Sequence, residues 1–271
     1  MSLVSLSVPA STEGAKLFDA YVPQLDSVAA DLTRSGASPE LDFALRFFPI
    51  YDLKRQTVAA LFCTPAPDCD RAEQIFGHKN FHDVALSDWP ILDCAILEHA
   101  VLLAARLAAS EVVVAVGASV TFGTLCDPIG RRLYREALRA MNPREKAHFL
   151  LKVEEIPDQT DLTRIVDIVS QVRPLASRVW VHLPNSRMLI GARDDLHASG
   201  LVLSLPARLT PYGVLSEARW LVDVAKRQKT LACMEHVDSA TDLEMTRRAG
   251  IRFAAGHALH RPSLPSRVLS S

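Results

Sequence analysis

Three residues near the end of the chain are of types that could take part in chemistry: Glu235, Asp238 and His257. The two acids follow an apolar run that starts at Leu231, and His257 follows a second short apolar run after Gly250. A helical pattern separates the two runs, which predicts strand, loop, helix and strand. In an α/β barrel the active site is built at the carboxyl ends of the strands. We therefore take these side chains as candidates for a site at a barrel mouth.

The rest of the chain shows the alternation that such a site requires. Strand patterns occupy residues 41–51, 57–62, 112–122, 148–155, 179–183, 201–205, 231–235 and the last run after Gly250. Helical patterns occupy residues 91–109, 128–141, 161–172, 186–198, 214–227 and 239–249. Alternating strands and helices imply a parallel sheet with helices outside. The first two strands are joined by a short turn and must be antiparallel, because a parallel return needs a crossover. The prediction is a TIM-like (β/α)8 barrel with an antiparallel first strand.

The barrel pattern does not cover the two ends of the chain. We expect residues 1–12 to be a disordered lead, 13–40 an N-terminal helical segment, 41–265 the barrel domain and 266–271 a tail. In the helical segment, apolar residues recur every three or four positions from Leu17 to Leu32, which is typical of an amphipathic helix. We expect this helix to cap the bottom of the barrel; docking on a partner is the alternative.

The composition excludes several classes of function. The 271 residues are 49% hydrophobic and 23% charged, values that suit a single α/β barrel. The net charge of -1 gives no electrostatic reason to expect nucleic acid or an acidic membrane as a partner. The longest apolar stretch, 95–109, contains Glu98, His99 and Arg106, so we expect no membrane insertion.

The cysteines and the first residues of the chain indicate a cellular location. The five cysteines are scattered and odd in number, and none belongs to a C-x-x-C motif. We interpret them as thiols in a reducing cytosol. The N-terminus lacks the basic and apolar regions of a signal peptide. We therefore expect a cytoplasmic protein.

Four histidines follow expected strand ends and could together form a zinc site, because zinc favours imidazole ligands. They are His182, His236, His257 and His260. The sequence contains no H-x-x-x-H or H-E-x-x-H pair, so we interpret them as unrelated loop residues. Ser119 and Ser204 lie in strand patterns, but neither belongs to a nucleophile elbow. The arginines at 131, 132, 135 and 139 suggest a solvated helix face with some capacity to bind a partner.

Three short motifs resemble those of EAL domains, the cyclic di-GMP phosphodiesterase family. Residues 47–53 (FFPIYDL) are similar to the family's Y-Q-P-I-x-D-L, and residues 234–239 (MEHVDS) to its A-E-G-V-E-T. Residues 255–257 (AGH) with Pro262 are similar to its Q-G-Y-x-x-x-x-P. The resemblance covers roughly residues 41–262 and includes the antiparallel first hairpin.

The family's active-site pattern is largely replaced. Phe62 stands at the metal-binding glutamate of E-A-L, Ala66 near the nucleotide-holding arginine, and Ser119 at the metal-binding asparagine. The glutamate of the next strand falls at Lys152 or Glu154, and the sequence leaves these two registers open. The paired aspartates meet the run His182-Leu183-Pro184, and the K-x-D motif meets Ser204 and Pro206. Glu235 keeps its identity, and Asp238 replaces a glutamate.

These replacements predict the loss of catalysis. Magnesium or manganese needs several hard oxygen ligands, and two-metal hydrolysis must hold two ions about 4 Å apart. We expect no bound metal, no cofactor and no cyclic di-GMP hydrolysis, with cyclic di-GMP binding disfavoured. We then interpret the polar residues at the strand ends as a vestigial pocket, formed by Glu235, Asp238, His257, Ser119, His182 and Ser204. The resemblance implies a regulatory protein that binds a protein partner and is compatible with a homodimer. The alternatives are a sensor that binds a nucleotide or small molecule without hydrolysis, and a barrel enzyme with new chemistry.

Overall fold

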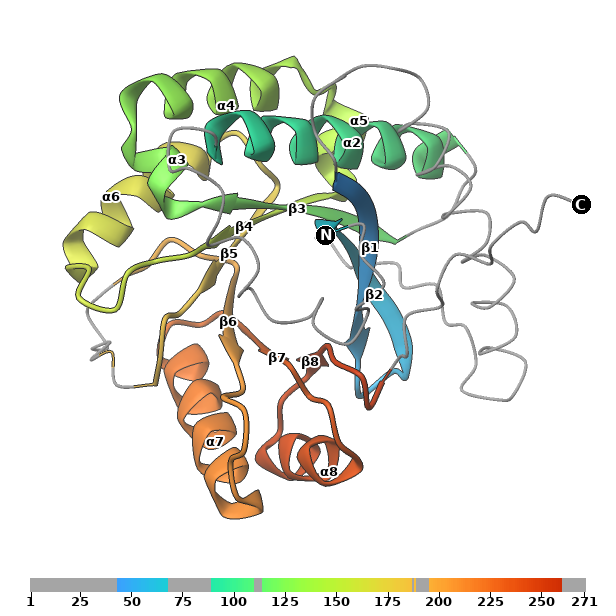
Figure 1. Cartoon of the computed structure of the whole chain (residues 1–271), viewed down its shortest axis with the longest axis vertical. Helices are drawn as coiled ribbons and strands as arrows, with labels where there is room; N and C mark the ends of the chain where they lie inside the picture. Colours follow the sequence, from blue (N-terminus) through green and yellow to red (C-terminus); the bar gives the residue numbers. More distant parts are fainter. Residues whose placement is uncertain (1–42, 68–88, 110–113, 187, 189–194, 260–271) are drawn as a thin grey trace, which may run out of the picture.

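The computed structural model describes residues 43–67, 89–109, 114–186, 188 and 195–259, and these form a closed eight-stranded barrel (Figure 1). The strands follow the chain order around the ring, so every strand has two neighbours and no edge is left open. Their bounds are β1 Phe43–Asp52, β2 Thr57–Pro67, β3 Ala115–Thr121, β4 Phe149–Glu154, β5 Arg178–His182, β6 Gly200–Ser204, β7 Leu231–Glu235 and β8 Phe253–Ala254. The predicted barrel is confirmed.

The first strand runs against both of its neighbours. β1 pairs antiparallel with β2 over its whole length, and it closes the ring through two antiparallel residue pairs with β8. All other neighbours pair in parallel. The tight β1–β2 turn is held by Asp52, whose Oδ1 accepts hydrogen bonds from the backbone N–H of Lys54 and Arg55. The sequence prediction of an antiparallel first strand is therefore correct.

Helices cover the outside of the ring. They are α2 Trp89–Ala109, α3 Phe122–Cys126, α4 Pro128–Ala140, α5 Pro143–His148, α6 Leu162–Val172, α7 Pro211–Arg227 and α8 Ala240–Ala249. In Figure 1, α2, α4 and α5 lie together above the barrel, and α7 and α8 lie below it. No described helix is long and apolar enough to cross a membrane.

Some helices differ from the sequence expectation. The short helices α3 and α5 were not predicted, because pieces of five and six residues are too short for an apolar period to be visible. The described part of 186–198 contains no helix, and residues 187 and 189–194 lie outside the description. The expected lead, N-terminal helix and tail also lie outside it.

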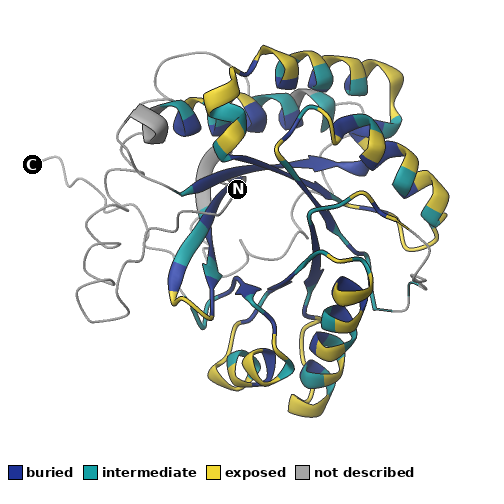
Figure 2. Ribbon diagram, turned by 180° about the vertical axis from the view of Figure 1, so that it is seen from behind, coloured by how far each residue is buried: buried dark blue, intermediate teal, exposed yellow. Residues whose placement is uncertain are grey.

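Two separate apolar clusters stabilise the barrel, and Figure 2 shows their buried residues between helices and strands and within the ring. The inner cluster is aromatic: the ring centroids of Phe62 and Trp180 are 6.2 Å apart, and those of Trp180 and Phe253 5.9 Å. Glycines provide room for these rings. A Cβ on Gly117 would lie 2.6 Å from the ring of Phe62, and one on Gly200 would lie 2.6 Å from Trp180. The base of the barrel is thus a packed core, and polar chemistry is confined to its mouth.

Candidate functional site

The strand alternation determines which side chains reach the barrel mouth. Leu150, Trp180, Val202 and Cys233 belong to the inner cluster. Since side chains alternate between the two faces of a strand, the residues two positions later also face the interior, one step nearer the mouth. Those residues are Lys152 on β4, His182 on β5, Ser204 on β6 and Glu235 on β7. The sequence thus places charged and polar side chains above an apolar floor.

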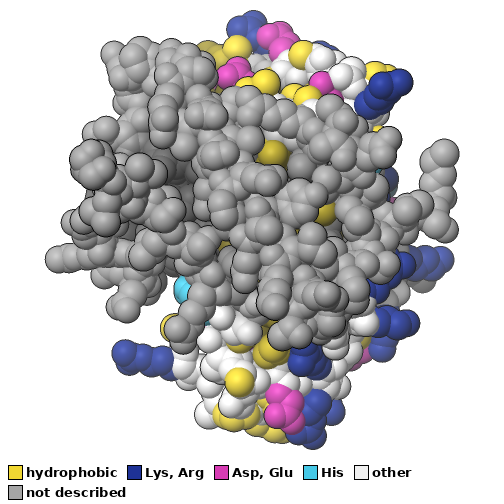
Figure 3. All heavy atoms as spheres, turned by 90° about the vertical axis from the view of Figure 1, so that its right-hand side faces the viewer, with side chains coloured by type: hydrophobic (Ala, Val, Ile, Leu, Met, Phe, Trp, Pro, Cys, Tyr) yellow, Lys and Arg dark blue, Asp and Glu magenta, His cyan; other side chains and the backbone are white. Residues whose placement is uncertain are grey.

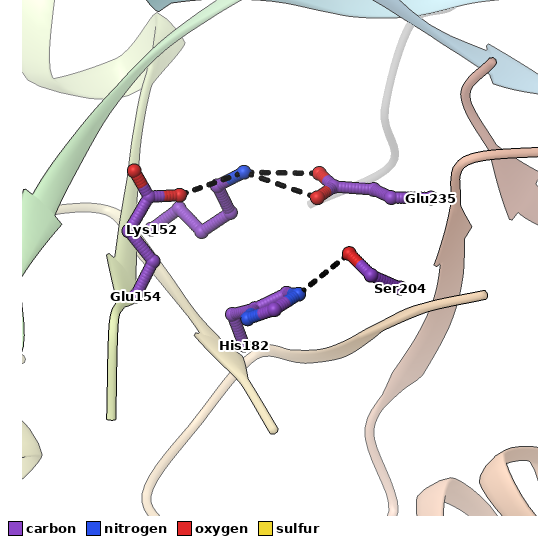
Figure 4. A network of polar contacts seen from close by, with 5 residues as sticks. All are labelled: Lys152, Glu154, His182, Ser204 and Glu235. Carbon is purple, nitrogen blue, oxygen red and sulfur yellow. Dashed lines mark hydrogen bonds and ion pairs between the residues drawn. The ribbon is translucent and has the colours of Figure 1, made fainter. Parts of the chain in front are cut away.

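Lys152 is the centre of a buried ionic cluster (Figure 4). Its Nζ lies 3.0 and 3.3 Å from the two carboxylate oxygens of Glu235 and 3.0 Å from Oε2 of Glu154. The side chains of Lys152, Glu235 and Glu154 are 7%, 5% and 14% exposed. The ring of Phe62 lies beneath, with its centroid 5.1 Å from Nζ, in cation–π range. One ammonium group is therefore shared by two carboxylates and one aromatic face.

This geometry holds the cluster in its charged form. Burial alone would raise the pKa of Glu235, but the charges of Lys152, His182 and His236 outweigh it and lower the pKa to about 2. Burial alone would lower the pKa of Lys152, but Glu154 and Glu235 raise it above its ordinary value. At neutral pH, Lys152 thus stays an ammonium group and Glu235 a carboxylate. The ammonium group lies between the carboxylates of Glu154 and Glu235, where a bound cation would otherwise be needed to neutralise them.

The pairing of β3 with β4 shows where Lys152 and Glu154, the two candidate positions on β4, lie in the barrel. Ser119 pairs with Lys152 and Thr121 with Glu154 across β3 and β4. Both β4 side chains enter the cluster, with Lys152 more deeply buried and Glu154 nearer the rim. Glu154 is thus part of the site, where it pairs with Lys152.

A second polar contact lies beside the ionic cluster. Nε2 of His182 and Oγ of Ser204 are 2.9 Å apart, and both residues are partly buried. Figure 4 shows this pair next to the lysine and the two glutamates. Ser119 is buried on β3, in register with Lys152. The structure therefore gathers Glu235, His182, Ser204 and Ser119, four of the six predicted pocket residues, around Lys152.

The other two predicted residues join loops above the strands. Oδ1 of Asp238 accepts a hydrogen bond from the backbone N–H of His257 and lies 2.9 Å from its ring Nδ1. Gly256 has φ 148°, and a Cβ there would lie 2.3 Å from the backbone oxygen of Val237. Both contacts tie the β7–α8 loop to the chain that follows β8. Asp238 and His257 thus have a visible structural role.

The structure adds one buried acid that sequence reasoning missed. Asp93 on α2 is 1% exposed, and its Oδ2 accepts hydrogen bonds from the backbone N–H and the hydroxyl of Thr121. Burial raises its pKa to about 7, although bonds from Thr124 and Thr121 oppose the shift. An aspartate inside the strongly apolar run 91–109 was the available signal. Asp93 joins α2 to the end of β3, next to the site.

The four histidines do not assemble a metal centre in the described part of the chain. No group of three or more His, Cys, Asp or Glu side chains there has the geometry to hold a metal ion. His260 lies outside the described residues. His236, directly after Glu235, has φ 58°, a left-handed conformation that turns the chain out of β7.

Comparison with known structures places the fold, although no protein-family model and no curated protein sequence matches the chain. The PaMucR phosphodiesterase in complex with c-di-GMP matches with a TM-score of 0.62 and 15% identity, over 89% of this chain and 98% of that one. The FimX EAL domain of Xanthomonas citri, also in complex with c-di-GMP, matches with a TM-score of 0.60 and 14% identity, over 90% and 93%. The S helix-GGDEF-EAL structure of Vibrio cholerae LapD matches with a TM-score of 0.63 and 12% identity, over 87% of this chain and 57% of that chain.

The barrel is therefore of the EAL type. At these identities the likeness concerns the fold, so function must be argued from the site.

Proposed function

We propose that this EAL-type barrel does not hydrolyse cyclic di-GMP and that it acts as a regulator by binding another protein. The observation that carries the proposal is the Lys152 ammonium between Glu154 and Glu235. A divalent cation at these carboxylates would lie beside a fixed positive charge in a poorly solvated site, where like-charge repulsion is strong. Two-metal hydrolysis needs carboxylates available to the ions, and here both are engaged by the lysine.

The surrounding residues support the same proposal. Phe62, which the family resemblance aligns with a metal-binding glutamate, is buried and adds an aromatic face beneath Lys152. His182 and Ser204 stand where the resemblance places further charged residues and contact each other. Hard oxygen ligands, which Mg²⁺ and Mn²⁺ prefer, are replaced by a hydrocarbon ring and an imidazole, and an ammonium group lies between the carboxylates that remain.

The direct test measures metal binding and hydrolysis on the same purified protein. We expect one equivalent of Mn²⁺ to keep the electron paramagnetic resonance signal of the hydrated ion, and cyclic di-GMP to stay intact with Mg²⁺ or Mn²⁺. Lys152→Gln, which removes the ammonium and keeps a polar side chain, is the matched variant; we expect it to weaken the Mn²⁺ signal. Metal-dependent hydrolysis by the unaltered protein, abolished in Glu235→Gln, would overturn the proposal.

A non-hydrolysing sensor is the second candidate, and the half-buried His182–Ser204 pair favours it. These two groups can donate and accept hydrogen bonds at the mouth of the barrel, and PaMucR and the FimX EAL domain, which have the same fold, form complexes with c-di-GMP. Calorimetry with cyclic di-GMP, with and without Mg²⁺ or Mn²⁺, separates the candidates. Micromolar binding lost in Ser204→Ala would favour the sensor, and the absence of heat would favour the regulator.

A further inference from the structure

The outer face of α4 combines exposed apolar side chains with arginines. Ile129 and Leu133 are 63% and 42% exposed, and they lie one helical turn apart. At 100° per residue, Ala140 shares their face, and Arg132 and Arg139 form a row along one flank. Glu136, also exposed, lies between the apolar residues and this row, one helical turn from each arginine. We call these six residues the α4 face. Figure 2 shows the solvent side of this helix as exposed.

Acidic side chains offset only half of the positive charge of this region. Residues 127–148 contain six Lys and Arg against three Asp and Glu, whereas the whole chain has 30 against 31. Within the described residues, no ion pair involves Arg132 or Arg139. At the height of α2, α4 and α5, Figure 3 also shows apolar and charged side chains next to one another. The chain thus concentrates positive charge at one place, although its total charge is near zero.

The helix that presents this face is firmly anchored. Asp127 caps its N-terminus by accepting a 2.6 Å hydrogen bond from the N–H of Gly130, and Pro128 fixes the first turn. Tyr134 and Leu138 bury its inner side. Gly130 packs so closely that a Cβ would lie 2.9 Å from the carbonyl oxygen of Thr124. A surface that is already rigid loses little entropy on binding.

On the basis of the proposed regulatory function, we infer that the α4 face is where this protein holds its partner, and that the partner offers an apolar segment flanked by Asp or Glu. We expect acids on the partner because basic side chains outnumber acidic ones two to one in this region, and Arg132 and Arg139 can make bidentate contacts with carboxylates. The exposed Ile129 and Leu133 indicate an apolar segment on the partner. They disfavour nucleic acid, because its phosphates make no favourable contacts with apolar side chains. A membrane surface is disfavoured because the larger apolar side of α4 is buried in the protein's own core.

The test locates the partner with a photo-crosslinking amino acid in the full-length protein in its native host. The probe replaces Leu133 in one variant and Tyr212 in the other; Tyr212 is an exposed position on α7 (79% exposed). We expect a protein adduct at position 133 and none at position 212, with the crosslinked peptide net acidic. The same partner, purified, is then titrated against the unaltered protein and against Arg132→Glu/Arg139→Glu.

The charge reversal should weaken binding at least tenfold, and rising salt should weaken binding of the unaltered protein. The matched control, Arg219→Glu/Lys226→Glu, reverses two exposed charges at the same seven-residue spacing on α7 and should change the affinity less than threefold. Leu133→Ser tests the apolar component without a change of charge and should weaken binding about fivefold. Circular dichroism and thermal unfolding of each variant identify any loss of folding.

Other outcomes separate the two proposals. The α4 face is not the binding site if the partner crosslinks at position 212, or if its affinity is the same after the Arg132/Arg139 reversal. The proposed regulatory function would survive either result. A second copy of this chain at position 133 overturns the acidic partner. Binding of duplex DNA or of phosphatidylglycerol vesicles that is lost in Arg132→Glu/Arg139→Glu would also overturn the acidic protein partner. If probes on every exposed helix yield no protein adduct, the regulatory function itself falls.

Discussion

Lys152 shows how one residue can change the chemistry of a barrel mouth. A bound cation can dissociate, but an ammonium group on β4 is attached to the chain and is always present. Its two carboxylate partners, Glu235 and Glu154, are only 5% and 14% exposed, so Lys152 neutralises charge that water reaches poorly. The lysine is thus both the reason that we expect no metal and a structural element of the mouth.

Replacing Lys152 by Met should therefore cost stability. Removing one partner of a buried pair leaves an uncompensated charge, and such changes cost about 3–5 kcal/mol. We expect Lys152→Met to lower the free energy of unfolding by about that amount in urea titrations. The double variant Lys152→Met/Glu235→Leu should recover much of the loss, because it buries no unpaired Glu235. An unchanged midpoint in the single variant would show that the cluster contributes little.

Asp93 predicts a pH dependence of stability. Its pKa in the folded protein, about 7, is above the ordinary value of 3.8, so folding disfavours its ionised form. The contribution of Asp93 to the free energy of unfolding is therefore fully present below about pH 4 and is lost as the pH rises to 7. Each pKa unit corresponds to about 1.4 kcal/mol, so the loss is on the order of a few kcal/mol.

The variant Asp93→Asn should remove this loss, because an amide oxygen can still accept both bonds from Thr121. We expect it to be more stable than the unaltered protein at pH 8 and to show a flatter profile from pH 4 to 8. Asp223→Asn, at an exposed position on α7, is the control. Identical profiles for Asp93→Asn and the unaltered protein would refute the assignment.

At the scale of elements, the spacing of neighbouring strands depends on small residues. Gly200 on β6 faces the indole of Trp180 on β5, where an added Cβ would lie 2.6 Å from the ring. Overpacking of this kind typically costs 1–3 kcal/mol. We expect Gly200→Ala to lose about that much stability in denaturant titrations followed by tryptophan fluorescence. Gly123→Ala, which has open space around it, should be near neutral. Equal stability of the two variants would show that Trp180 can move at no cost.

The same scale explains what the sequence could and could not predict. Apolar runs and the short 52–56 turn were enough to predict β1, β2 and their antiparallel pairing, because these signals are local. The position of Lys152 between Glu154 and Glu235 could not be predicted, since a one-residue change of register on β4 would point it outward. The anchoring of Thr121 by Asp93 spans 28 residues and leaves no local pattern. Glu235 was recognised because a family-like motif surrounds it.

For the molecule as a whole, the seam between β1 and β8 is one of the two shortest joints of the ring, since β8 shares two residue pairs with β1 and two with β7. Two residue pairs close it, and Arg252 reinforces it by donating two hydrogen bonds of 3.0 and 2.9 Å to Oδ2 of the buried Asp52. β1 and β2, by contrast, pair along ten residues of β1. The ring is therefore expected to open first at the short joints of β8.

Arg252→Gln should loosen the seam selectively. Charge-assisted hydrogen bonds are worth about 1.5–3 kcal/mol each, and Asp52 would keep its bonds from the β1–β2 turn. We expect faster amide hydrogen exchange in β1 and β8 and little change in β4 and β5. Arg248→Gln, at an exposed position on α8, is the control. Uniform acceleration over all strands would instead indicate global unfolding.

The reversed first strand also decides where the barrel can be connected to anything else. Because β1 runs against β2, its first residue, Phe43, lies level with Pro67 at the carboxyl end of the parallel strands. The chain that leaves β8 passes Asp238 at that same end. A parallel first strand would have put entry and exit at opposite ends of the ring. Here the chain enters β1 and leaves β8 at the same end of the ring, the end that carries Lys152 and Glu235.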